Sequence, residues 1–308
     1  MLLLLYGYWK KRKAGKTEKI MSKKKKSKKL GLSEFMILIV FLVGLSLLAY
    51  PTFSDMWNRY RNTKLITDYE QNTQEISHEK KEQMLRDAEA YNRQHTVNCI
   101  VDAFNEENEY VLSHPYDTYL NPQGDGIMGF ISIPKIQVEL AIYHGTGAET
   151  LEEGVGHVEG TSLPVGGNGT HAVIAGHRGL PSAKLFTDLD QMQEGDVFYI
   201  HILDHVLAYQ VDQIETVDPD EIEALAIEEG KDYVTLLTCT PYGVNTHRLL
   251  IRGTRTEYHP EEADMEGLME IVVKDKRVLL LVLGLVLFII ILLFMLKGNQ
   301  KKSKEEGD

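Results

Sequence analysis

The stretch from Tyr233 to Ile251, YVTLLTCTPYGVNTHRLLI, indicates two β-strands joined by a turn. The first strand, TLLTC, is apolar and β-branched, and it ends at Cys239. Proline and glycine in Thr240-Pro-Tyr-Gly243 then interrupt the strand. A cysteine at the end of a strand, beside a turn, is held rigidly with its sulfur near solvent, as a nucleophile must be. Taken alone, however, a cysteine in a strand is more often a small core residue.

Arg248 is the first candidate partner of Cys239. It lies nine residues after the cysteine, within the predicted strand Thr246–Ile251. A turn between the two strands would bring Arg248 back beside Cys239. Arg252 lies on the same face of this strand, and an arginine in a strand is usually a solvated edge residue. Spacing alone therefore does not separate the two arginines.

His177 is the second candidate partner. It stands between two glycines in Gly176-His-Arg-Gly179, directly after the predicted strand His171–Ala175. Flanking glycines allow backbone or ligand to approach closely, so this histidine suits chemistry better than packing. The alternative is a turn histidine that hydrogen-bonds to a carbonyl group.

The other histidines do not follow a metal-binding pattern. The chain has no His-Glu-x-x-His motif and no closely paired cysteines. We therefore predict no metal and no other cofactor. The histidines considered as zinc ligands beside Cys239 are His157, His171, His201, His205 and His247.

Short runs with a period of two surround these residues and predict strands across residues 125–258. Turn residues such as Gly166-Gly-Asn-Gly169 separate the runs. Helical signal is weak there and limited to Ala148–Gly154, Leu185–Leu189 and Asp220–Glu228. Seven or eight short strands in about 130 residues indicate an all-β fold, a closed or nearly closed β-barrel. The predicted strands are Ile127–Ile133, Val138–Tyr143, His171–Ala175, Val197–Leu203, Val206–Ile214, Tyr233–Thr238 and Thr246–Ile251.

Two apolar runs flank the predicted barrel, at residues 35–53 and 278–296. Each is close to the roughly 20 residues that a helix needs to cross the hydrocarbon core, so two transmembrane helices are predicted. A cleaved signal peptide is the alternative for the first run, but no small-residue cleavage site follows Tyr50 cleanly. A buried core helix is the alternative for the second, but its all-apolar circumference suits lipid better.

Charge is distributed unevenly along the chain. Residues 1–34 carry twelve Lys and Arg against two Glu, and residues 297–308 carry four Lys against three acidic residues. The net charge is nevertheless −12, so the middle of the chain is strongly acidic, which argues against a nucleic-acid partner. The positive-inside rule predicts that both termini are cytoplasmic and that residues 53–277 lie outside the cell. Met21, followed by Ser22 and four lysines, is an alternative start of the chain.

The segments beside the barrel are predicted from composition. Residues 54–98 are polar, with apolar residues at helical spacing and without Gly or Pro, and so predict two amphipathic helices. Proline and glycine then indicate an ordered loop or flap, so we assign 54–124 to extracellular helices and a lid. Residues 259–277 form a charged stalk before the second span, and residues 297–308 form a cytoplasmic tail.

These features together resemble the sortases, membrane-anchored cysteine transpeptidases of Gram-positive bacteria. The matching residues are Cys239 at the end of TLLTC, Arg248 in the following strand, and His177 in its glycine-flanked loop. The second apolar run and the long N-terminal appendage resemble class C, the pilus-assembling sortases, rather than the type with one N-terminal anchor. Neighbouring segments also match, namely GVGH at 154–157, EGTSLP at 159–164 and TPYGVNTHR at 240–248.

The resemblance implies an eight-stranded sortase barrel at 125–258 and a thiol acyl transfer. Cys239 would cleave an LPXTG-like sorting signal between Thr and Gly, and His177 would act as general acid and base. Arg248 would hold the substrate and stabilise the oxyanion, with the backbone N–H of Thr240 as a further candidate donor. The partners implied are pilin subunits, which supply the signal and an acceptor lysine, and the lipid bilayer.

Class C sortases carry a lid with an Asp-Pro-aromatic motif over the active site. The best match here is Asp102-Ala-Phe104, in which Ala103 replaces proline and leaves the backbone freer, so a looser lid is predicted. The alternatives are that this segment is merely loop, or that residues 114–117 form the lid. Cys99 is interpreted as an incidental second thiol, with a regulatory disulfide as the alternative.

Two other functions remain open at this stage. A sortase that anchors surface proteins to a cell-wall precursor is the nearest alternative, but the second span and the lid-like loop count against it. The alternative of another class is a non-catalytic, membrane-tethered structural or binding protein, which would not need the Cys239 thiol.

Overall fold

The computed structural model describes residues 32–94, 116–180, 182–221, 223–260, 276, 278–280 and 282–290. The chain divides into two units, Met1–Leu47 and Leu48–Asp308, and each is described by itself. The predicted lid residues Asp102 and Phe104 lie outside the described residues, together with Ala103 and Cys99. The lid therefore stays a prediction.

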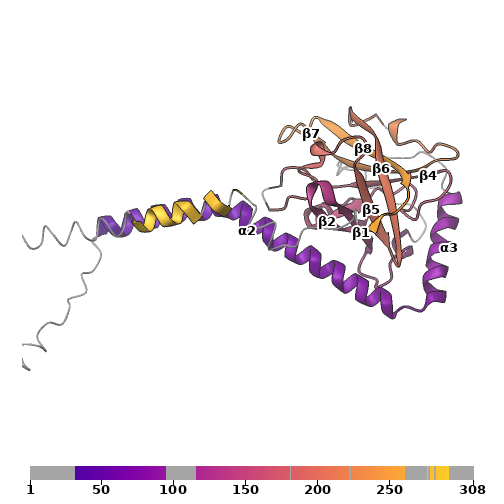
Figure 1. The fold of residues 1–308 in the computed structure, drawn as a ribbon, viewed down its shortest axis with the longest axis horizontal. Helices are drawn as coiled ribbons and strands as arrows, with labels where there is room; N and C mark the ends of the chain where they lie inside the picture. Colours follow the sequence, from indigo (N-terminus) through magenta and orange to yellow (C-terminus); the bar gives the residue numbers. More distant parts are fainter. Residues whose placement is uncertain are drawn as a thin grey trace, which may run out of the picture. The chain divides into compact units, whose positions relative to one another are not determined.

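Eight strands in the second unit form a closed barrel, in the order β1-β2-β3-β4-β7-β8-β6-β5 (Figure 1). The β2–β3 and β4–β7 pairs are parallel, and the other pairs are antiparallel. The predicted all-β barrel is thus confirmed. The strands are β1 (Ile127–Ile133), β2 (Val138–His144), β3 (Val155–His157), β4 (Thr170–Ala175), β5 (Val197–Ile202), β6 (His205–Val217), β7 (Asp232–Thr240) and β8 (His247–Thr256).

The sequence missed β3 and underestimated β6. Strand β3 has only three residues, too few for an alternating pattern, and it exists because it pairs with both β2 and β4. Strand β6 continues three residues beyond the predicted end at Ile214, because its last residues pair with β8. In both cases pairing between distant segments, rather than local pattern, sets the bounds of the strand.

The weak helical signals have different outcomes. The predicted Ala148–Gly154 helix is confirmed as α4 (Ala148–Glu153). The other two predictions are wrong as α-helices: Leu185–Leu189 is a turn that leads into the 3₁₀ helix η3 (Leu189–Gln191), and Asp220–Glu228 contains only the 3₁₀ helix η4 (Glu223–Leu225). Short segments propagate an α-helix poorly, and burial of Leu189 and Leu225 fixes these turns instead. The remaining 3₁₀ turns are η1 (Tyr116–Thr118) and η2 (Pro134–Ile136).

The central strands are buried on both faces. Ile174, Leu236 and Ile251 belong to the cluster that fills the barrel. Their neighbours of opposite parity, including Leu237 and Leu250, belong to a second cluster that the η4 segment helps to cover. Side chains alternate between the two faces of a strand, so Cys239 lies on the same face as Leu237, outside the barrel interior.

Two long helices precede the barrel. Helix α2 (Leu32–Glu75) passes through Pro51 without ending, and α3 (His78–Gln94) follows it. The appendage helices predicted in residues 54–98 are therefore the second part of α2 and α3. The part of α2 in the second unit packs on the barrel, where the buried Tyr69 hydroxyl donates to the Met128 carbonyl (2.9 Å). Desolvation in this position raises the pKa of Tyr69 to about 12.

Helix α3 packs beside the barrel (Figure 1). Its Asn92 forms a reciprocal pair with the backbone of Leu163, donating to the carbonyl (3.0 Å) and accepting from the N–H (2.7 Å). Lys81 forms an ion pair with Asp204 in the β5–β6 turn (2.8 Å). The appendage is thus joined to the barrel by specific polar contacts as well as by apolar packing.

The apolar part of α2 fits a membrane anchor. Among the described residues, α2 is the one helix long and apolar enough to cross a membrane by length and composition. The second apolar run is described only in part, as a shorter apolar helix over Val278–Ile290. The second transmembrane helix therefore remains a prediction.

Candidate active site

Cys239 and Arg248 are directly opposed on neighbouring antiparallel strands. Cys239 is the penultimate residue of β7, and its cross-strand partner on β8 is Arg248. Directly opposed residues project to the same face of a sheet, with Cβ atoms roughly 5 Å apart. Both residues are nearly buried, with 7% of Cys239 and 8% of Arg248 exposed. Cys239 and Arg248 therefore lie side by side on the sheet, as the sequence predicts.

The structure also separates Arg248 from Arg252, which spacing could not do. Arg252 pairs with Thr235, about 13 Å farther along the sheet from Cys239. It is engaged there by both carboxylate oxygens of Asp212 (3.0 Å each) and lies over the Tyr233 ring. Arg252 therefore has a structural role, and Arg248 is the arginine beside the cysteine.

His177 approaches Cys239 from the opposite side of β7. Strands β4 and β7 are parallel, with Ala175 paired to Leu237. The Gly176 N–H donates to the Leu237 carbonyl (3.0 Å), and the Thr238 hydroxyl donates to the Gly176 carbonyl (2.7 Å). Continuing this register by two residues brings His177 alongside Cys239. The three predicted site residues thus stand on three adjacent chain segments.

The glycines around His177 have different functions. A side chain at Gly176 would collide with Phe186 and Val155, because an added Cβ would lie 2.7 and 2.9 Å from their side-chain atoms. Gly179 has a φ of +81°, which side-chain-bearing residues rarely adopt. The first glycine therefore allows close packing of the loop, and the second allows it to turn.

The surroundings of His177 disfavour its charged form. Its ring is half buried, and desolvation lowers the pKa of His177, while the nearby Glu152 carboxylate partly opposes this shift. Arg248 is held at the β7–β8 turn, where its Nη1 donates to the carbonyls of Asn245 (3.3 Å) and His247 (3.2 Å). The site thus combines a fixed cation with a histidine that releases its proton readily.

Arg178 is a residue of this region that the sequence analysis did not single out. Its Nη1 donates to the hydroxyl of Thr240 (3.0 Å), and it forms an ion pair with Asp190. The Arg178 side chain is only 7% exposed, and its Nε has no hydrogen-bond partner among the residues that the structure describes. Its position next to His177 in the glycine-flanked motif is the sequence feature that could have identified it. Arg178 ties the histidine loop to the residue that follows Cys239.

Two of the other histidines are structural. His157 is fully buried, with its Nε2 donating to the Ser162 carbonyl (2.8 Å) and its Nδ1 2.7 Å from the Tyr116 hydroxyl. Desolvation lowers its pKa to about 4. His171 Nε2 lies 2.7 Å from the Thr235 hydroxyl. These rings connect barrel strands to the segments that cover them.

Comparison with known proteins shows which family this fold and site belong to. The family model described as the sortase domain matches residues 131–256. A solved sortase C of Streptococcus pneumoniae is 44% identical, with a TM-score of 0.58, covering 63% of this chain and 97% of that chain. Sortase C1 of Streptococcus agalactiae is 43% identical, with a TM-score of 0.59, covering 64% and 100%. The chain belongs to the sortase family, whose members are cysteine transpeptidases.

Curated relatives are more distant. Sortase A of Bacillus anthracis is 30% identical over 127 residues, which cover 41% of this chain and 59% of that protein. Sortase D of Bacillus subtilis is 31% identical over 137 residues, covering 44% and 66%. The chain thus spans less than two thirds of the length of these relatives. Its similarity to the solved class C structures is higher and covers nearly all of their chains.

Proposed function

We propose that this protein is a class C sortase that polymerises pilins. It cleaves an LPXTG-like sorting signal between Thr and Gly and joins the new Thr carboxyl group to a pilin lysine. The observation that carries this proposal is the cross-strand pair of Cys239 and Arg248, with His177 entering from the adjacent parallel strand. The solved Streptococcus pneumoniae sortase C was described in terms of pilin substrate specificity, which supports the pilin as substrate class.

The acyl transfer takes place in two halves at Cys239. Its thiolate attacks the Thr carbonyl carbon, and the C–N bond to Gly breaks as the His177 imidazolium gives its proton to the leaving amine. A lysine ε-amine then attacks the thioester, His177 takes up the proton, and the thiolate leaves. The products are an isopeptide bond and regenerated enzyme.

Arg248 stabilises the charge that develops on the carbonyl oxygen in both halves. Its guanidinium is nearly buried, and a donor in a water-poor site is worth more than one in water. The backbone N–H of Thr240 is the proposed second oxyanion donor.

The protonation states limit the rate. With ordinary pKa values of about 8.5 for cysteine and 6.5 for histidine, thiolate and imidazolium coexist in roughly one molecule in a hundred at about pH 7.5. Desolvation lowers the pKa of His177, which reduces the imidazolium fraction further. Slow turnover is therefore expected unless bound substrate shifts these equilibria.

The proposed topology has two membrane spans, residues 35–53 and 278–296, with both termini in the cytoplasm and the barrel outside. The basic residues before the first run and after the second support this orientation. We also propose that Asp102 and Phe104 belong to a lid over Cys239, loosened by Ala103.

The proposal is tested by incubating the full chain, in detergent, with LPXTG peptides and purified pilins. Mass spectrometry should find the peptide acyl group on Cys239, and gels should show a ladder of covalent pilin oligomers. Transfer to a cell-wall precursor without a ladder would favour the anchoring alternative. Unchanged cellular function in Cys239→Ala would favour a non-catalytic tethered protein.

A further inference from the structure

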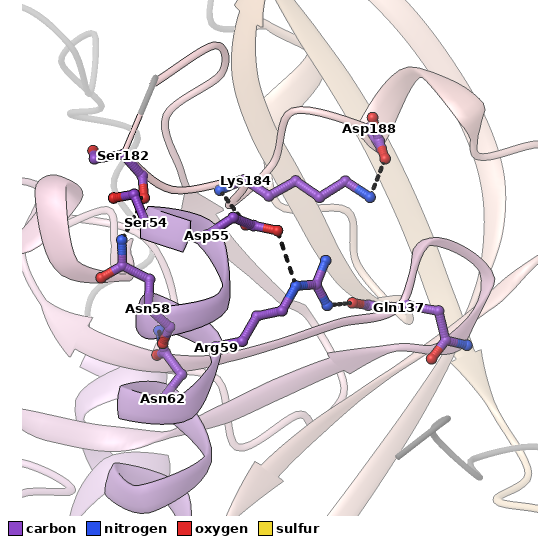
Figure 2. Close-up of polar contacts among 9 residues, drawn as sticks. All are labelled: Ser54, Asp55, Asn58, Arg59, Asn62, Gln137, Ser182, Lys184 and Asp188. Carbon is purple, nitrogen blue, oxygen red and sulfur yellow. Dashed lines mark hydrogen bonds and ion pairs between the residues drawn. The ribbon is translucent and has the colours of Figure 1, made fainter. Parts of the chain in front are cut away.

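The loop that carries His177 is held from outside the barrel. This loop, described over residues 176–180 and 182–188, is fastened on its inner side by the buried Phe186, whose N–H donates to the His177 carbonyl (3.1 Å). Ser182 and Lys184 of this loop contact helix α2 (Figure 2). The conformation of the histidine loop thus depends on side chains of helix α2 as well as on contacts within the barrel.

Helix α2 recognises the backbone of this loop. The Ser54 hydroxyl (2.7 Å) and the Asn58 side-chain amide (2.6 Å) both donate to the carbonyl of Ser182. Two residues along, the Lys184 N–H donates to the carboxylate of Asp55 (3.1 Å). Contacts to backbone groups fix the path of the loop, and a hydrogen bond to a carboxylate is among the stronger kinds.

The Asp55 carboxylate is itself braced against the barrel. Its second oxygen accepts from Arg59 Nε (3.2 Å), and Arg59 Nη1 donates to the carbonyl of Gln137, between β1 and β2 (2.9 Å). Figure 2 shows this series of contacts running from the barrel through Arg59 and Asp55 to Lys184. Asp55 is mostly buried, with 14% of its side chain exposed, so solvent competes weakly for these bonds. The brace limits movement of α2 relative to the histidine loop.

We infer that Asp55 and Asn58, aided by Ser54, are positioning residues for His177. They touch neither substrate nor reacting atoms, and they act by holding the loop that presents the imidazole to Cys239. This inference rests on the proposed function, in which His177 transfers the proton. It makes the helix that carries the anchor a structural part of the active site.

The test uses the full chain in detergent. It compares the single variant Asn58→Ala and the double variant Ser54→Ala/Asn58→Ala with a matched control. Asn72→Ala is the control, because Asn72 lies on the same helix and donates to Gln123 (2.8 Å), outside the histidine loop. The readouts are kcat and KM for peptide transfer, the His177 titration by NMR, and hydrogen exchange at the Lys184 amide. Asp55→Asn keeps an acceptor oxygen for that amide and serves as the conservative variant.

We expect Asn58→Ala to lower kcat roughly tenfold and the double variant up to about a hundredfold, because small misplacements of catalytic groups are costly. KM should stay within about twofold of the wild-type value, while the His177 titration shifts and exchange at Lys184 accelerates. Asp55→Asn should lose less activity than Asp55→Ala. Asn72→Ala should match the wild type.

The inference is overturned if Asn58→Ala equals Asn72→Ala in kcat and in the His177 titration although exchange at Lys184 has accelerated. If the double variant does not fold, the single variants decide by the same comparison. His177→Ala and Cys239→Ala separate this result from failure of the proposed function. If those two retain transfer, the proposed function fails, and if they lose it while Asn58→Ala is normal, only the positioning role fails.

Discussion

The two halves of the candidate site are built differently. Cys239 and Arg248 stand on paired strands, where a regular hydrogen-bond ladder fixes their relation. His177 stands on a loop whose path depends on Phe186, on Arg178 and on side chains of helix α2. The thiol–guanidinium pair should therefore tolerate changes elsewhere in the molecule, whereas the histidine should be sensitive to them. Each prediction below tests one side of this difference.

The largest expected effect is loss of transfer in Cys239→Ala. In the proposed mechanism the Cys239 sulfur forms the covalent intermediate, so we expect transpeptidation to fall at least about a thousandfold. Cys99→Ser should remain close to wild type. The rate of peptide transfer is measured for both variants, and alkylation mapped by mass spectrometry shows which cysteine is reactive. A dead Cys99→Ser and an active Cys239→Ala would mean that the nucleophile is misassigned.

Arg248→Lys tests the second member of the strand pair. A planar guanidinium orients two donors at once, and a flexible ammonium does this poorly, so kcat/KM should fall roughly a hundredfold. The matched control is Arg252→Lys on the same face of β8, where the arginine binds Asp212, and its effect should be only a few fold. Similar losses in both variants would show that strand position does not determine which arginine acts.

The proposed lid would limit access to both halves of the site. Replacing Asp102 and Phe104 with Ala should raise the alkylation rate of Cys239 and peptide hydrolysis together. A closure free energy of about 1–3 kcal/mol corresponds to an increase of roughly five- to a hundred-and-fifty-fold. Ala103→Pro should act in the opposite direction if the backbone there accepts proline. Equal Cys239 alkylation rates in the wild type, the double Ala variant and Ala103→Pro would exclude gating by this segment.

The smallest expected effect is the contribution of the buried His157 to the pH dependence of stability, which should exceed that of the half-buried His177. The pKa of His157 is about 4 in the folded protein, below the ordinary 6.5, so the unfolded chain binds the proton more readily. The stabilising contribution of His157 is therefore complete above about pH 6.5 and falls as pH decreases toward 4, by roughly 3 kcal/mol in all. Urea unfolding at several pH values measures this.

His157→Gln should reduce this acid sensitivity, although it also disturbs the contacts with Tyr116 and Ser162. His177→Ala should leave most of the acid sensitivity of stability unchanged, because His177 is only half buried. If His177→Ala removed the acid sensitivity instead, the loop histidine would be coupled to folding as closely as the barrel histidine.

The sequence by itself determined the local features of this protein. Alternating runs gave most of the barrel strands, the glycines marked the histidine loop, and the apolar length of the first run predicted the anchor helix. A strand ending in Cys239, a turn, and a second strand are enough to predict that the second strand returns beside the cysteine, because a hairpin brings its strands together, but they do not show whether Arg248 or Arg252 is the nearer arginine.

Only the tertiary structure decided relations between distant segments. It distinguished Arg248 from Arg252 through the register of β7 and β8, and it placed the loop that begins at Gly176 next to the end of β7 through the parallel pairing of β4 and β7. It also connected Asp55 to Lys184 across 129 positions of the chain. The physical reason is that strand register and contacts between helix and loop are set by packing between segments that carry no mutual signal in their local patterns.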